Sequence, residues 1–157
     1  MTDSGLIARW AHLYEDQKIL SAGVTWVHLS GILLGGGAAV AADREGLRFD
    51  PRDAFRAREL ARWRAVHRWV LVGLALIILS GLLMLFSDLK TFLPSVLYWT
   101  KMALVVALLF NGYLRLRAER VLETGSDNGL RTFRATSIVS LVLWFTILLA
   151  GMMLTTL

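Results

Sequence analysis

Two ionisable side chains, His28 and Lys101, lie inside long apolar runs of this sequence. Ionisable residues are costly inside a membrane, so each needs a partner or a function. His28 lies about nine residues into its run and Lys101 about six residues into another, which places both roughly 9 to 14 Å below the same membrane surface. An imidazole there can bind haem iron or another metal, and an ammonium can pair with a carboxylate. We therefore expect one site, with His28 as ligand and Lys101 as catalytic residue.

The helix face that carries His28 is a stripe of small residues, which includes Gly31 and Gly35 at GxxxG spacing. Such a stripe is typical of close helix packing. It also leaves space for a flat ring bound by His28, which makes both glycines candidate cofactor-binding positions. The two interpretations stay open.

The helix face that carries Lys101 also carries Asn111 and Arg115, and we expect this face to point into the protein interior. Asn111 is therefore a further candidate for cofactor binding. Lys101 has a second interpretation, because its long stem can carry the ammonium outward to the membrane surface.

His67 and Arg68 lie at the edge of another apolar run and are flanked by Trp63 and Trp69, a combination typical of a membrane interface. Either a structural role or a role in cofactor binding fits this position. A single haem held by His28 and His67 together is disfavoured, because the two would differ in depth by roughly 10 to 15 Å.

Methionines gather at the same ends of the runs as His28. A thioether and an imidazole together bind haem iron or Cu(I). Methionine is also a common apolar filler, so a packing role stays open. The candidate metal ligands are His28, Met84, Met102 and Met152.

Other catalytic signatures are missing from the sequence. The chain has no cysteine, which excludes disulfides, thiol catalysis and zinc–thiolate sites. It has no glycine-rich phosphate loop and no HExxH helix, and we expect no pair of buried carboxylates.

Four apolar runs, at about 19–42, 66–86, 95–114 and 135–157, must position these residues, and each is long enough to cross a bilayer as a helix. The chain is 56% hydrophobic and only 18% charged, against about 25% charged in soluble domains. We predict an all-α, antiparallel bundle of four transmembrane helices in one domain, 1–157.

Apolar residues at helical spacing predict a further short helix at about 6–17 on the outer membrane surface. Pro51 predicts a helix start, and 124–129 predicts a turn.

Arginine is concentrated in two connecting segments. Seven arginines lie in 43–65 and five in 115–134, against Arg9, Lys18 and Lys90 on the opposite side. Basic loops stay in the cytoplasm, so we expect a multi-pass protein of the bacterial inner membrane with both termini in the periplasm. The net charge of +5 is thereby explained without a nucleic-acid partner.

The segment Tyr98-Trp99-Thr100-Lys101-Met102-Ala103-Leu104, followed by Asn111-Gly112-Tyr113, resembles the third span of small membrane proteins of the copper-resistance protein D family and the HemJ-type protoporphyrinogen oxidases. His28, Gly35, Gly36 and Arg44 resemble the first span of these proteins, and the resemblance covers about residues 24 to 117. It implies that His28 and Lys101 are functional and that the cofactor is haem b.

These observations predict a small haem-b-binding redox protein of the membrane, in electron transfer or as an oxidoreductase, with its site in the outer half of the bundle. One alternative is a Cu(I)-handling protein that uses His28 and the methionines. Another is an accessory subunit that packs on a further membrane protein or on a second copy of the chain.

Overall fold

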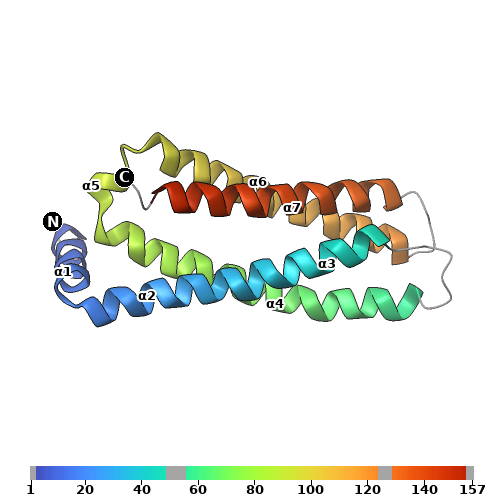
Figure 1. Cartoon of the computed structure of the whole chain (residues 1–157), viewed down its shortest axis with the longest axis horizontal. Helices are drawn as coiled ribbons and strands as arrows, with labels where there is room; N and C mark the ends of the chain where they lie inside the picture. The colour runs from blue at the N-terminus through green and yellow to red at the C-terminus, as the bar shows by residue number, and fades with distance from the viewer. Residues whose placement is uncertain (1–2, 49–55, 124–128, 155–157) are drawn as a thin grey trace.

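The computed structural model describes residues 3–48, 56–123 and 129–154, and nearly all of them are helical. The described helices are α1 (Asp3–Asp16), α2 (Lys18–Gly31), the π-helical turn η1 (Ile32–Gly36), α3 (Gly37–Arg48), α4 (Arg56–Ser87), α5 (Leu89–Phe92), α6 (Val96–Glu123) and α7 (Leu130–Leu154). The described residues include no strand, so the all-α prediction is confirmed (Figure 1). The predicted helix start at Pro51 and most of the predicted turn at 124–129 lie outside the described residues.

Four helical segments of the described chain are long and apolar enough to cross a membrane. They are Lys18–Arg48, Ala65–Ser87, Val96–Leu122 and Leu130–Leu154, which makes the chain a multi-pass membrane protein. The first and third continue past the predicted ends at 42 and 114. Those predictions marked where the apolar runs stop, but arginine, glutamate and leucine are strong helix formers, so the helices continue beyond the apolar region.

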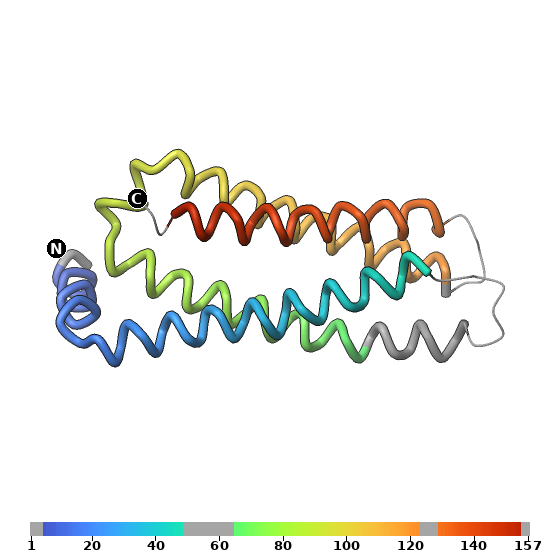
Figure 2. The backbone as a smooth tube through the Cα atoms, in the orientation of Figure 1, coloured from blue at the N-terminus to red at the C-terminus, as the bar shows by residue number. Residues whose placement is uncertain are grey.

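The bundle is built from two antiparallel hairpins. α2, η1 and α3 form one continuous helix that packs along α4, while α6 packs along α7 (Figure 2). The first helix drifts away from α4 along its length, so that α3 contacts α7 and joins the two hairpins. α1, α5 and the end of α7 lie at one end of the bundle, called here the terminal end (Figure 1). The opposite end, where α3 ends and α7 begins, is called the loop end.

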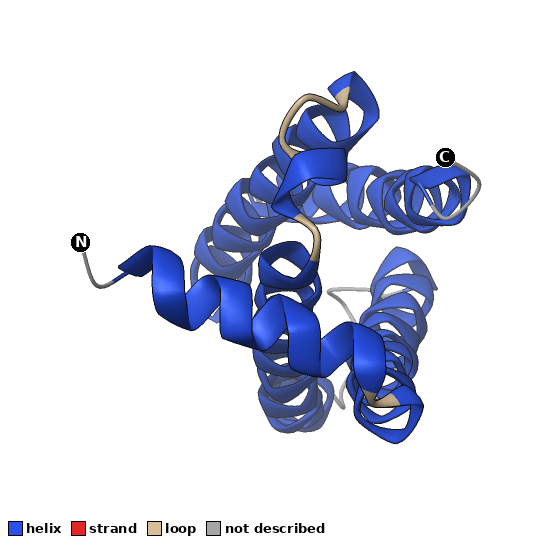
Figure 3. Ribbon diagram, turned by 90° about the vertical axis from the view of Figure 1, so that its left-hand side faces the viewer, coloured by secondary structure: helices blue, strands red, loops and turns tan. Residues whose placement is uncertain are grey.

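α1 lies across the terminal end of the first hairpin (Figure 3), where it contacts α2 and α4. The indole N–H of Trp10 donates a hydrogen bond of 2.9 Å to the carbonyl oxygen of Leu83 on α4. The predicted helix at 6–17 is present, but it begins three residues earlier, at Asp3, and ends one residue earlier, at Asp16. His12 is exposed and its Nδ1 lies 3.2 Å from the carboxylate of Asp16.

The small-residue stripe of the first helix packs directly against α4. A Cβ atom placed on Gly31 would lie 3.0 Å from the carbonyl oxygen of Gly73, and one on Gly35 would lie 3.0 Å from the Cα of Gly73. On the other side, a Cβ on Gly36 would lie 3.2 Å from the ring of Trp144 on α7. The glycines thus allow a close approach of helices, which was one of the two interpretations of the stripe.

Candidate functional site

His28 projects from α2 against α4 and is half-buried. Its Nδ1 lies 2.9 Å from the hydroxyl oxygen of Ser80, and that hydroxyl also contacts the backbone carbonyls of Leu76 and Ile77. A serine has one hydroxyl hydrogen, which a carbonyl can only accept. Ser80 therefore donates to the backbone and accepts from His28, so Nδ1 carries the ring hydrogen.

This tautomer leaves Nε2 of His28 with a free lone pair on the side of the ring that faces away from Ser80. A histidine that binds a metal is commonly held in this way, with its other ring nitrogen donating to a fixed acceptor. The ring packs beside Gly81 of α4, because a Cβ there would lie 3.5 Å from Cε1 of His28, an ordinary contact distance. In this tautomer Nε2 has the basic lone pair of the ring.

Lys101 projects from α6 toward α7 and is half-buried. A Cβ on Gly151 would lie 3.5 Å from its Nζ, so the ammonium lies against a glycine of α7. The two residues that the sequence singled out thus lie toward the same end of the bundle but on different hairpins, His28 against Ser80 of α4 and Lys101 against Gly151 of α7.

No carboxylate of the described residues forms an ion pair with Lys101. In a membrane interior a lysine without a counter-ion favours an anion as its partner. His28, Ser80 and Lys101, called here the terminal-end site, thus offer one free nitrogen lone pair and one free cation.

At the loop end, three charged residues form a buried cluster that sequence analysis missed. Asp43 of α3 is 0% exposed, and it pairs with the guanidinium of Arg115 of α6. The Nε of Arg115 donates to Glu119 at 3.2 Å, and its Nη2 donates to the carbonyl oxygen of Ala42 at 3.3 Å. The expectation of no buried carboxylate pair is therefore wrong, because Asp43 and Glu119 are both buried around one arginine.

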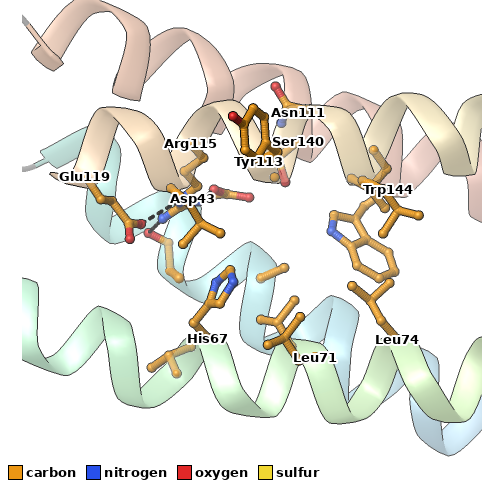
Figure 4. Close-up of a pocket in the computed structure, with 18 residues that line it drawn as sticks. Asp43, His67, Leu71, Leu74, Asn111, Tyr113, Arg115, Glu119, Ser140 and Trp144 are labelled. Atoms are coloured by element: carbon orange, nitrogen blue, oxygen red, sulfur yellow. Dashed lines mark hydrogen bonds and ion pairs between the residues drawn. The ribbon is translucent and has the colours of Figure 1, made fainter. Parts of the chain in front are cut away.

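A pocket of about 230 Å³ adjoins this charged cluster and is lined by α3, α4, α6 and α7 (Figure 4). His67 extends from α4 toward Asp43 and Arg115 at one side, and Trp144 lies at the other. Most of the wall between them is aliphatic. The pocket is thus apolar in the middle and polar at both sides.

The sequence-predicted cofactor residues divide between these two regions. His67 and Asn111 line the loop-end pocket, and the side-chain amide of Asn111 donates to the carbonyl oxygen of Thr136 at 2.9 Å. Arg68 is exposed. His28 is level with Ser80, which lies thirteen residues beyond His67 on α4, or about 20 Å along the helix axis. One iron therefore cannot be bound by both histidines.

The predicted methionine ligands differ in exposure. Met102 and Met152 are exposed on the outside of their helices, whereas Met84 is half-buried. Met84 follows Ser80 by four residues, so it lies one turn further along the same face of α4. It is therefore the methionine best placed to approach His28.

Within the described residues, no three histidine or acidic side chains are grouped so that they could hold a metal ion. Comparison with protein-family models, with curated proteins and with solved structures finds no match to this chain. Inferences about function therefore depend on the chemistry of the two regions.

Proposed function

We propose that this chain is a small membrane redox protein that binds haem b at the terminal-end site. His28 would hold the haem iron through Nε2, and Lys101 would pair with a carboxylate of the haem or of a substrate. The bound haem would supply one-electron chemistry at its iron.

The hydrogen bond between Nδ1 of His28 and Ser80 is the observation on which this proposal depends most. With Nδ1 as its donor, the imidazole has an unprotonated Nε2 and an orientation set by Ser80. A ligand oriented in advance loses less freedom on binding than a free one. In this proposal Gly31 and Gly35 hold α2 against α4 and so position His28.

Lys101 gives the proposed site its preference for an anion. Haem b has two propionates, and a half-buried ammonium that no carboxylate of the described residues pairs with matches them in charge. The resemblance of residues 98–113 to the third span of the HemJ-type oxidases supports the same use of Lys101.

Absorption spectroscopy of the purified protein, with and without added haem, tests the proposal. We expect a Soret band that is lost in His28→Ala and retained in His67→Ala and in His12→Ala, the last being an exposed histidine that serves as matched control. A Soret band lost in His67→Ala but kept in His28→Ala would move the site to the loop end. A protein that never binds haem would end the haem proposal.

A Cu(I) site formed by His28 and Met84 is the second candidate, because Met84 lies one turn from the serine that holds His28. Metal analysis separates the two: copper bound at one equivalent in a colourless protein, and lost in Met84→Leu, would favour copper over haem.

We further propose that the protein lies in the bacterial inner membrane with the terminal end in the periplasm. The arginine-rich loops support this orientation. The chain lacks cysteine, so His12→Cys and Thr132→Cys, both exposed positions, give clean reporters. In intact cells an impermeant thiol reagent should label the first and not the second, and the reverse pattern would invert the orientation.

A further inference from the structure

The loop-end pocket is a second candidate site, distant from His28. The exposure of the residues that line it indicates how a compound enters. It lies between α4 and α6, two helices that make little contact with each other. Leu71 of α4 and Leu109 of α6 both line the pocket and are 54% and 44% exposed. In a membrane these exposed leucines face lipid, so the pocket opens sideways toward the hydrocarbon. A compound dissolved in the bilayer can therefore enter it directly.

The size of the pocket limits its occupant to a single ring. Pockets for drug-sized ligands are about 300–1,000 Å³, and this one is about 230 Å³. A porphyrin is too large, but a substituted six-membered ring is not. The aliphatic wall between the polar sides, formed by Val70, Leu74 and Leu108 among others, suits the flat faces and apolar edges of such a ring.

The polar groups that line the pocket include hydrogen-bond donors without acceptors. Among the described residues, none accepts a hydrogen bond from the indole N–H of Trp144 or from the hydroxyl of Ser140, and both residues are buried. The indole nitrogen of Trp144 points into the pocket (Figure 4). In the described chain the fully buried side-chain atoms without a hydrogen-bond partner belong to Asp43 and Ser137, so the indole N–H is accessible from the pocket, and an oxygen acceptor on a ligand there can accept its hydrogen bond. His67 supplies a second donor at the other side.

The charged cluster excludes anionic lipids as occupants of the loop-end pocket. Arg115 is already engaged by Asp43 and Glu119, so a fatty acid or a phospholipid phosphate would meet two carboxylates and no free cation. A neutral ring with one oxygen acceptor at each of two opposite positions matches the polar sides and the apolar middle.

We propose that this pocket binds the head group of a lipid-soluble para-quinone. One quinone carbonyl accepts a hydrogen bond from the indole N–H of Trp144, and the opposite carbonyl accepts one from His67. The isoprenoid tail leaves between Leu71 and Leu109 into the bilayer. This site goes beyond the proposed haem function, because it lies about 20 Å from His28 along α4 and uses none of the terminal-end residues.

Quinone binding to the haem-free protein in phosphatidylcholine nanodiscs tests this proposal separately from the haem proposal. Ubiquinone-1 is titrated while tryptophan fluorescence is recorded, and we expect saturable quenching. His67→Leu removes a donor without altering any tryptophan and should weaken binding about tenfold.

A pair of glycine variants supplies a pocket-blocking test with a matched control. Gly112 lines the pocket, and a Cβ there would meet no atom within 4 Å. The Cβ of Gly112→Leu therefore meets no clash, and the rest of the leucine side chain should narrow the pocket and abolish saturable quenching. Gly37 has the same open surroundings but does not line the pocket, so Gly37→Leu should bind like the parent. Helical content and melting temperature verify that both variants are folded.

Two results would overturn the quinone site. One is quenching that rises without saturation in every variant, which indicates only partitioning of the quinone into lipid. The other is a folded Gly112→Leu protein that binds as tightly as the parent. Neither result bears on the Soret band, so the haem and quinone proposals fail independently.

Discussion

The two ends of the bundle differ in whether their charged side chains are paired. At the loop end, charges are buried and paired, with Arg115 between Asp43 and Glu119, and Asn111 ties α6 to α7. At the terminal end, Lys101 has no carboxylate partner among the described residues, and the links between helices are uncharged side chains, His28 bonded to Ser80 and Trp10 to the backbone of Leu83. Paired buried charges join helices, whereas unpaired ones are available to a ligand.

Contacts between the hairpins follow the same division. α3 contacts α7 toward the loop end, and Ala39, Leu108 and Trp144 form a buried apolar cluster there. No comparable contact joins α2 to α6 or α7 within the described chain. We infer that the loop-end half holds the bundle together and that the terminal-end half can adjust around a ligand.

Removing Arg115 should give the largest loss of stability. Its side chain is only 10% exposed, and Arg115→Met would leave two buried carboxylates without their cation. Breaking a buried ion pair in this way costs about 3–5 kcal/mol. We expect a large drop in the melting temperature of the protein in detergent, measured from the loss of helical content. The variant Asp43→Asn/Arg115→Met/Glu119→Gln should recover much of it, because no buried charge remains. An Arg115→Met protein as stable as the parent would show that the cluster does not join the hairpins.

Tight packing of the first helix on α4 should give an intermediate effect. A Cβ on Gly73 would overlap the backbone of Gly35, so Gly73→Ala must push the two helices apart. Overpacking of this kind costs about 1–3 kcal/mol. Gly112→Ala is the matched control, since its Cβ meets nothing within 4 Å, and alanine favours a helix over glycine. Melting temperatures should fall for the first variant and stay level or rise for the second; equal values would contradict the packing described here.

Much of this fold could be predicted from the sequence. Apolar runs of about 20 residues predict membrane-spanning helices because the bilayer fixes the length required, and the structure has four such helices. Helical spacing also placed Lys101, Asn111 and Arg115 on one interior face. Helix ends beyond the bilayer were predicted less well, since no change in hydrophobicity marks where α3 or α6 stops.

The loop-end cluster could not be predicted with the same ease. Arg115 and Glu119 are four residues apart, a spacing that pairs them on one helix face, and this signal was present. Asp43 lies on another helix in a segment rich in arginine, so its burial depends on the drift of α3 toward α7. That drift depends on how Gly36 packs against Trp144, a tertiary contact that periodicity along one helix does not show.

Lys101 should show the smallest effect on stability and a clear effect on ligand binding. Lys101→Met keeps the length and the apolar stem but removes a charge that has no carboxylate partner in the described structure, so folding should be unchanged or slightly favoured. The variant should retain less haem during washing, or show lower catalytic turnover, because the propionate loses its cation. Lys101→Arg keeps the charge with a different geometry and should be intermediate. Melting temperature and Soret absorbance measured on the same samples separate the two effects. If Lys101→Met retains haem as well as the parent does, the lysine is only an anchor at the membrane surface, and the terminal-end site depends on His28 alone.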